Sequence, residues 1–248
     1  MAEQSPAHAG PTVAERAAAT VRNPLTLTLL TLTFTTGLVD AVSYLGLGRV
    51  FTANMTGNIV LLGFGIGGAG GLPVVSPLVS LGAFLVGAAA GGVLASKVAH
   101  RHFFHVGSAL AIEVALVAVA AVLAATANPR PNAFSGDVVV ALLALAMGVR
   151  NATVRRVAVP DLTTTVLTMT LTGLAADSRI AGGSGKGTVR RSSAVLAMLT
   201  GAIAGALMLK TNLTLPLVCA AGLALVTWIA YVSVGRRESA AGRTAEAG

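Results

Sequence analysis

The chain has 248 residues, of which 54% are apolar and only 10% are charged, and its mean hydropathy is +0.81. A soluble domain carries about 25% charged residues, so this composition excludes an ordinary soluble protein. The net charge of +8 does not indicate a nucleic-acid partner, because the basic residues are scattered between apolar runs without interleaved aromatic residues. We therefore predict an all-α polytopic membrane protein whose main partner is the lipid bilayer.

In chain order, the sequence predicts a disordered cytoplasmic tail over residues 1–23, a single membrane domain over 24–234 and a cytoplasmic tail over 235–248. A span needs about 20 residues to cross about 30 Å of hydrocarbon. A shorter candidate covers about 136–153, and five runs are long enough without question: 25–46, 73–96, 105–127, 191–210 and 213–234.

Two further apolar stretches, about 57–70 and 165–177, are too short to be assigned from length alone. If both cross, the protein has eight spans and seven of its 17 basic residues lie outside. If neither crosses, it has six spans and only Arg49, Arg130 and Lys210 lie outside. Because basic residues concentrate in cytoplasmic loops, we predict six spans, two re-entrant half-helices and two cytoplasmic termini. Eight full spans are the alternative.

The sequence also resembles itself. The block "GLVDA" from Gly37 matches "GVRNA" from Gly148, and "FLVGAAAGGVL" from Phe84 matches "MLTGAIAGALM" from Met198. Between these blocks, three residues of the first copy fall opposite three of the second, namely Thr52, Met55 and Thr56 opposite Thr164, Leu167 and Thr168. Each copy holds three spans and one short stretch, so the second copy enters from the opposite face. The pattern predicts an inverted repeat with halves of about 24–127 and 136–234.

The two short stretches are preceded by polar residues, "VFTANMTGN" from Val50 and "PDLTTTVLT" from Pro160. Ser, Thr, Asp and Asn cap helix N-termini, so Thr56 or Asn54 could cap a half-helix from Gly57, and Asp161, Thr163 or Thr164 could cap the second. Half-helix starts that meet near the midplane could bind a solute. The candidate binding residues are Asn54, Thr56, Asn58, Asn151, Thr164 and Thr168.

These motifs resemble the YoaK family of bacterial integral membrane proteins. The resemblance covers roughly residues 25–235 and depends most on Phe51–Asn58 and on Asn151 with Asp161–Thr168. It implies a multi-pass protein of the bacterial inner membrane, in a family whose biochemical role is not established. It supplies no catalytic residues.

Two acids lie inside predicted spans, and an ionisable group in hydrocarbon is costly unless it faces a cavity or a partner. Asp40 and Glu113 are therefore candidates for proton coupling or substrate binding, with a structural pairing as the alternative for each. Asn151 occupies the position that the repeat relates to Asp40. Arg150 could be buried and functional, but we favour its extension towards the cytoplasmic end together with Arg155 and Arg156.

We predict a transporter or channel for a small polar or anionic solute. Half-helix dipoles favour an anion whereas the acids favour the opposite charge, so the charge of the solute stays open. The competing class is a non-transporting scaffold or assembly partner. The sequence has no catalytic constellation, metal motif or nucleotide loop, so we expect no enzyme activity, cofactor or metal. The single cysteine, Cys219, permits no intrachain disulfide, and nothing in the sequence supports a homo-oligomer.

Overall fold

A computed structural model describes residues 24–97, 102–157, 167–185 and 187–245. This part of the chain is helical and contains no strand. Six helices are long and apolar enough to cross a membrane: α2 (Pro24–Gly46), α4 (Val75–Lys97), α5 (His102–Thr126), α6 (Phe134–Val157), α8 (Thr188–Leu209) and α9 (Thr214–Ala245). The prediction of an all-α polytopic protein with six spans is thus confirmed.

Two further helices are short. α3 (Met55–Ile66) has 12 residues and α7 (Leu167–Ala176) has 10. At 1.5 Å per residue they measure about 18 and 15 Å, well below the thickness of hydrocarbon. A 3-10 turn, η1 (Arg179–Ala181), follows α7. The predicted tail over 1–23 lies outside the described residues, and α9 continues past its apolar part, which ends at Val234, to Ala245.

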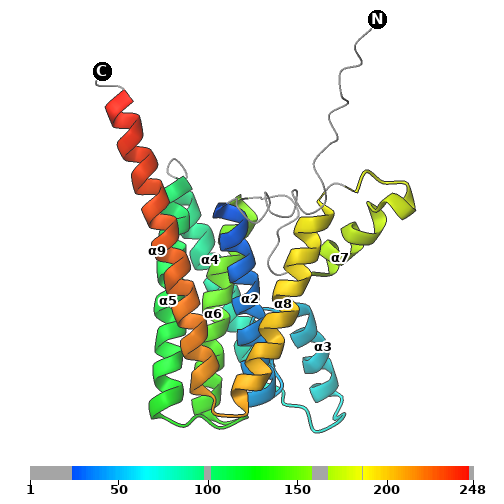
Figure 1. The fold of residues 1–248 in the computed structure, drawn as a ribbon. Coiled ribbons are helices and arrows are strands. Elements are labelled where there is room, and N and C mark those ends of the chain that lie inside the picture. The colour runs from blue at the N-terminus through cyan, green and yellow to red at the C-terminus, as the bar shows by residue number, and fades with distance from the viewer. Residues whose placement is uncertain (1–23, 98–101, 158–166, 186, 246–248) are drawn as a thin grey trace, which may run out of the picture.

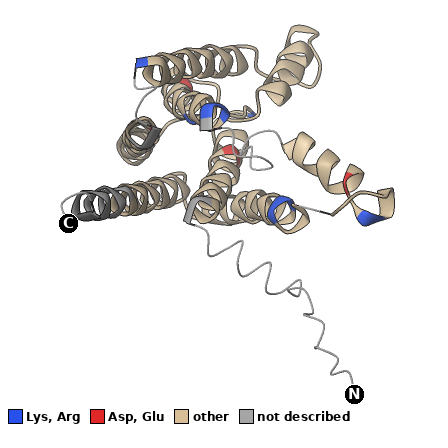
Figure 2. Cartoon of the chain, turned by 90° about the horizontal axis from the view of Figure 1, so that it is seen from above, with Lys and Arg blue, Asp and Glu red and all other residues tan. Residues whose placement is uncertain are grey.

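The six long helices run alternately up and down, so α2 begins and α9 ends at the same end of the bundle (Figure 1). The two short helices lie at opposite ends, α3 near the end of α2 and α7 near the start of α8. Seen from above, charged residues on the helices are few (Figure 2), as the apolar composition requires.

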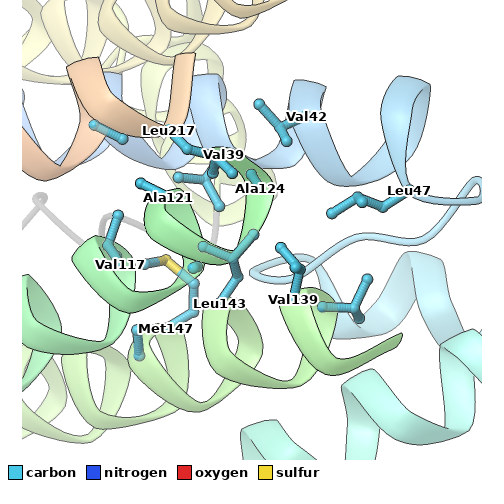
Figure 3. Close-up of a cluster of buried hydrophobic side chains, with 14 of the residues drawn as sticks. Val39, Val42, Leu47, Val117, Ala121, Ala124, Val139, Leu143, Met147 and Leu217 are labelled. Carbon is cyan, nitrogen blue, oxygen red and sulfur yellow. The ribbon is translucent and has the colours of Figure 1, made fainter. Parts of the chain in front are cut away.

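The buried core lies where α2, α5, α6 and α9 meet (Figure 3). Val39 of α2, Val117 of α5, Leu143 of α6 and Leu217 of α9 are each at most 2% exposed. α4 and α8 pack against the outside of this group, and their apolar outward faces are exposed in the isolated chain, as lipid-facing surfaces must be.

The largest helix contacts join the two halves of the predicted repeat, α4 with α6 and α2 with α8. Glycine makes both contacts possible because the backbones almost touch. A Cβ on Gly37 would lie 2.2 Å from the Met198 carbonyl oxygen, and a Cβ on Gly201 would lie 2.1 Å from that of Phe34. Any side chain at either position would therefore push α2 and α8 apart.

The same crossing recurs between α6 and α4 with the equivalent residues. A Cβ on Gly148 would lie 2.2 Å from the Phe84 carbonyl oxygen, and a Cβ on Gly87 would lie 2.2 Å from that of Leu145. The sequence repeat relates Gly37 to Gly148 and Gly87 to Gly201. α2 and α8 run in the same direction, and α4 and α6 both run in the opposite direction (Figure 1). The two crossings are therefore oriented oppositely along the bundle. This is the packing expected of an inverted repeat.

Candidate functional site

The chain turns back on itself after α2. Gly48 and Arg49 both have positive φ, at 119° and 58°, a conformation that glycine adopts readily and arginine rarely. The turn directs residues 50–54 back along α2, and α3 then starts at Met55 and runs towards the end of the bundle at which α2 ends (Figure 1).

Asp40 holds this returning segment. Its Oδ1 accepts hydrogen bonds from the backbone N–H of Thr52 at 2.9 Å, from that of Ala53 at 3.0 Å and from the Thr52 hydroxyl at 3.2 Å. The Asp40 side chain, which is 5% exposed, lies six residues before the end of α2. The segment therefore returns by about 9 Å along the helix before α3 begins.

Asn58 fixes the other side of the same segment. Its Oδ1 accepts the Phe51 N–H at 2.9 Å, while its Nδ2 donates to the Phe51 carbonyl at 2.7 Å and to the Ser80 hydroxyl of α4 at 3.0 Å. Asn58 is fully buried. The proposed binding residue Asn58 thus has its amide engaged in satisfying a backbone that would otherwise carry unpaired polar groups inside the protein.

Asn54 is the N-cap of α3, and it was one of the two predicted caps. The helix begins at Met55 rather than at the predicted Gly57. The Asn54 Oδ1 accepts the Gly57 N–H at 3.2 Å. Thr56 instead lies in the first turn, exposed. The predicted caps of the second short helix, Asp161, Thr163 and Thr164, lie outside the described residues.

Replacement of Asn54 by alanine should loosen the first turn of α3, because loss of an N-cap costs about 1 kcal/mol. The matched control is Thr56→Ala, which removes a hydroxyl from the same turn without removing the cap. Hydrogen–deuterium exchange at the start of α3 should be about fivefold faster in Asn54→Ala than in the control. Equal exchange in the two variants would contradict the capping role.

A large cavity of about 1160 Å³ lies beside the start of α3. We call it the arginine cavity, because Arg155 and Arg156 from the last turn of α6 line it. Its other polar lining side chains come from α2, α3, α6 and α7 and from the cap of α3, namely Tyr44, Asn54, Thr56, Asn151 and Thr168. Four of the six predicted binding residues therefore lie on one cavity.

A second cavity of about 410 Å³ lies between α2, α7 and α8, and we call it the Asp40 cavity. Asp40, Thr36, Met198 and Leu167 contribute to its wall. The two cavities have five lining residues in common, Tyr44, Phe51, Ala53, Asn54 and Thr168. The segment held by Asp40 and Asn58 is thus the partition between them, with the Tyr44 and Phe51 rings stacked at 4.9 Å.

The comparisons with known proteins agree with this architecture. A family model described as "Protein of unknown function (DUF1275)" matches residues 28–230. The chain belongs to this family. It is 37% identical over 161 residues to the UPF0700 transmembrane protein YoaK of Bacillus subtilis (strain 168), an alignment that covers 64% of this chain and 68% of that protein. No solved structure matches the chain.

Membership of the family confirms the resemblance predicted from the sequence motifs and agrees with a multi-pass membrane protein. It assigns no chemistry to any residue. Within the stretch "FTANMTGN", Thr52 and Asn58 hold the returning segment while Asn54 and Thr56 line the arginine cavity.

The repeat-related position of Asp40 is occupied by Asn151, and the two side chains do different things. Asn151 Nδ2 donates to the Met147 carbonyl one turn earlier in α6, at 2.9 Å, and the residue lines the arginine cavity. Thr164, the counterpart of Thr52, lies outside the described residues. The two halves therefore share their helix crossings but differ in the side chain at this position.

The favoured prediction for Arg150, extension to the cytoplasmic end, was wrong, and the residue is buried as the alternative required. Arg150 is 3% exposed and does not extend to the end of the bundle. Its Nε donates to Glu113 Oε2 at 2.8 Å and its Nη2 to Glu113 Oε1, while Nη1 donates to the Leu32 carbonyl and the Thr36 hydroxyl, each at 2.7 Å. A second hydroxyl, that of Thr35, accepts from Nη2 at 3.1 Å.

This buried network was missed because Arg150 was grouped with the exposed Arg155 and Arg156 of the same helix. Its signal was present in the sequence, since two opposite charges within predicted spans cost least when they pair. The pairing favours a structural role for Glu113. Asp40 has no such salt bridge among the described residues, so it is the better of the two candidates for chemistry at the cavities.

Proposed function

We propose that the protein is a membrane transporter that moves a small polar solute through the arginine and Asp40 cavities. The observation that carries the proposal is the arginine cavity itself, which brings Asn54, Thr56, Asn151 and Thr168 to one space between residues of α2, α3, α4, α6 and α7. Pockets of about 300–1,000 Å³ suit a small molecule, so the space is ample for one. The sequence offers no catalytic constellation, so we assign transport rather than an enzymatic reaction.

In this proposal the end of the bundle at which α2 begins faces the cytoplasm of a bacterial cell. Arg155 and Arg156 lie at that end, as the positive-inside rule requires. α3 and α7 act as re-entrant half-helices from opposite faces. Irregular backbone at membrane depth is tolerated where it lines a cavity, and residues 50–54 line both cavities in part.

Accessibility of single cysteines tests this proposal. In a chain with Cys219 replaced by serine, cysteines at positions 54, 56 and 168 should react with a small water-soluble thiol reagent, because all three native side chains are exposed and line the cavity. Ser43→Cys is the matched control, since Ser43 is fully buried in α2 and should be protected.

Protection at 54, 56 and 168 would instead support a non-transporting scaffold in which the motifs pack against one another or against a partner. Uptake of solutes into cells that lack or overproduce the protein then assigns the direction. A labelled cavity without any change in uptake across solutes of either charge would count against transport.

A further inference from the structure

The charged groups of the two cavities are segregated. Among the described residues, the arginine cavity is lined by Arg155 and Arg156 and by no acid. Of the residues that the structure describes, Asp40 and no base line the Asp40 cavity. Glu113 is paired with Arg150, whereas Asp40 forms no salt bridge among the described residues and lines a cavity. The basic and acidic side chains, which made the charge of the solute uncertain from the sequence, thus line different cavities.

The arginine cavity has the features that bind anions. Met55 and Thr56 form the first turn of α3 and line the cavity, and their backbone N–H groups donate to no described acceptor. The positive end of the helix dipole lies there, and Arg155 and Arg156 line the same space. Fixed dipoles and like charges focused in a cleft raise the local concentration of the opposite ion.

The Asp40 carboxylate is only half satisfied. Oδ1 accepts three hydrogen bonds from Thr52 and Ala53, whereas Oδ2 accepts none from the described residues, although the side chain is 95% buried and lines the Asp40 cavity. A buried carboxylate whose second oxygen has no hydrogen-bond donor and that lines a cavity is a suitable site for a proton.

The charged and titratable groups around Asp40 are few. From α6 comes Arg150, which is bonded to Thr36 one turn from Asp40 and to Glu113 of α5. Tyr44 of α2 lines the same cavity, whereas α7, α8 and the segment before α3 bring only uncharged described side chains. Because Arg150 and Glu113 neutralise each other, protonation of Asp40 changes the net charge beside the partition between the cavities.

We propose that the transported solute is a small anion and that it binds together with a proton on Asp40 Oδ2. The anion occupies the arginine cavity at the free N–H groups of α3, and an ionised Asp40 across the partition repels it. Protonation of Asp40 removes that repulsion, so the proton and the anion favour each other's binding. The proton comes from water on one side of the membrane and returns to water on the other, with no bond of the solute broken.

The inference rests on the proposed transport function, and anion binding to the purified full chain tests it. The probes are sodium nitrate and sodium methanesulfonate, whose charges do not change with pH, and binding is followed by the rise in Tm at constant ionic strength. If only the Asp40-protonated protein binds, apparent affinity should fall about tenfold per pH unit above the titration of Asp40.

Two variants complete the test. Asp40→Asn keeps an oxygen for the Thr52 and Ala53 N–H groups, and it should bind the probes at every pH with no such slope. Arg155→Gln with Arg156→Gln changes two exposed side chains, so it should keep the Tm of the free protein and lose affinity at every pH. If Asp40→Asn does not fold, the pH dependence of anion affinity in the native chain and the affinity of the arginine variant still test the proposal.

The inference is overturned if the native chain binds the probes no better than the arginine variant, or if its affinity does not change with pH. It is also overturned if the slope survives in Asp40→Asn. Choline gluconate, which supplies an organic cation, distinguishes failure of the anion inference from failure of the proposed transport function. If choline raises the Tm and the cysteines at 54, 56 and 168 are labelled, the proposed transport stands and the solute is a cation rather than an anion. Protected cysteines and no response to either ion reject both proposals.

Discussion

Replacement of Gly87 by alanine is expected to destabilise the protein by about 3 kcal/mol, the upper part of the usual cost of overpacking. The added methyl group would lie 2.2 Å from the Leu145 carbonyl oxygen, and its three nearest neighbours are all backbone atoms of Leu145 in α6. No side chain can rotate away, so α4 and α6 must separate along their closest contact. Thermal unfolding in detergent should show a clear fall in Tm.

The matched control is Gly82→Ala, which is the same substitution in the same helix. A Cβ on Gly82 meets nothing within 4 Å, so this variant should lose no stability. Gly201→Ala should lose stability as Gly87→Ala does, because it places a methyl group 2.1 Å from the Phe34 carbonyl oxygen at the equivalent crossing. Equal stability of the Gly82 and Gly87 variants would refute the close approach of α4 and α6.

Replacement of Glu113 by alanine is expected to cost about 3–5 kcal/mol, because it leaves the Arg150 guanidinium buried without its counter-charge. Arg150 keeps its hydrogen bonds to Thr35, Thr36 and the Leu32 carbonyl, but these groups carry no charge. Thermal unfolding should therefore show a large loss of stability.

The control is the double variant Glu113→Leu with Arg150→Met, in which both charges are replaced by apolar side chains of similar volume. Such replacements are often neutral or stabilising, so the double variant should recover most of the loss seen in Glu113→Ala. If the double variant were as unstable as the single one, the hydrogen bonds of Arg150 rather than its charge would be what α2 and α6 require.

Much of the fold followed from apolar length and charge placement. Runs of about 20 apolar residues gave the six spans, and the repeated blocks around Gly37, Gly87, Gly148 and Gly201 are the residues that make the two helix crossings. Glycine occupies these crossings because a close backbone approach requires the absence of a side chain. The ends of the spans were less well predicted, as with α6, which runs four residues beyond the predicted 136–153 to Val157.

The candidate site was predicted less completely. Asn54, Thr56, Asn151 and Thr168 share a cavity, whereas Asn58 is fully buried among backbone and Ser80. Sequence alone does not separate these roles, because an asparagine that binds a solute and one that satisfies a returning backbone have the same type and a similar place in the motif. The pairing of Arg150 with Glu113 depends on the approach of α5 to α6, which no spacing within the chain specifies.

The glycine crossings also determine when the protein can assemble during its synthesis. The first half emerges with α2 and α4, yet their main packing partners, α8 and α6, belong to the second half. Until those helices are made, Gly37 and Gly87 expose bare backbone grooves to lipid. Each half is therefore an incomplete unit. The chain resembles two different subunits joined covalently, in which the helices of one half reach their native neighbours only by packing against the other half.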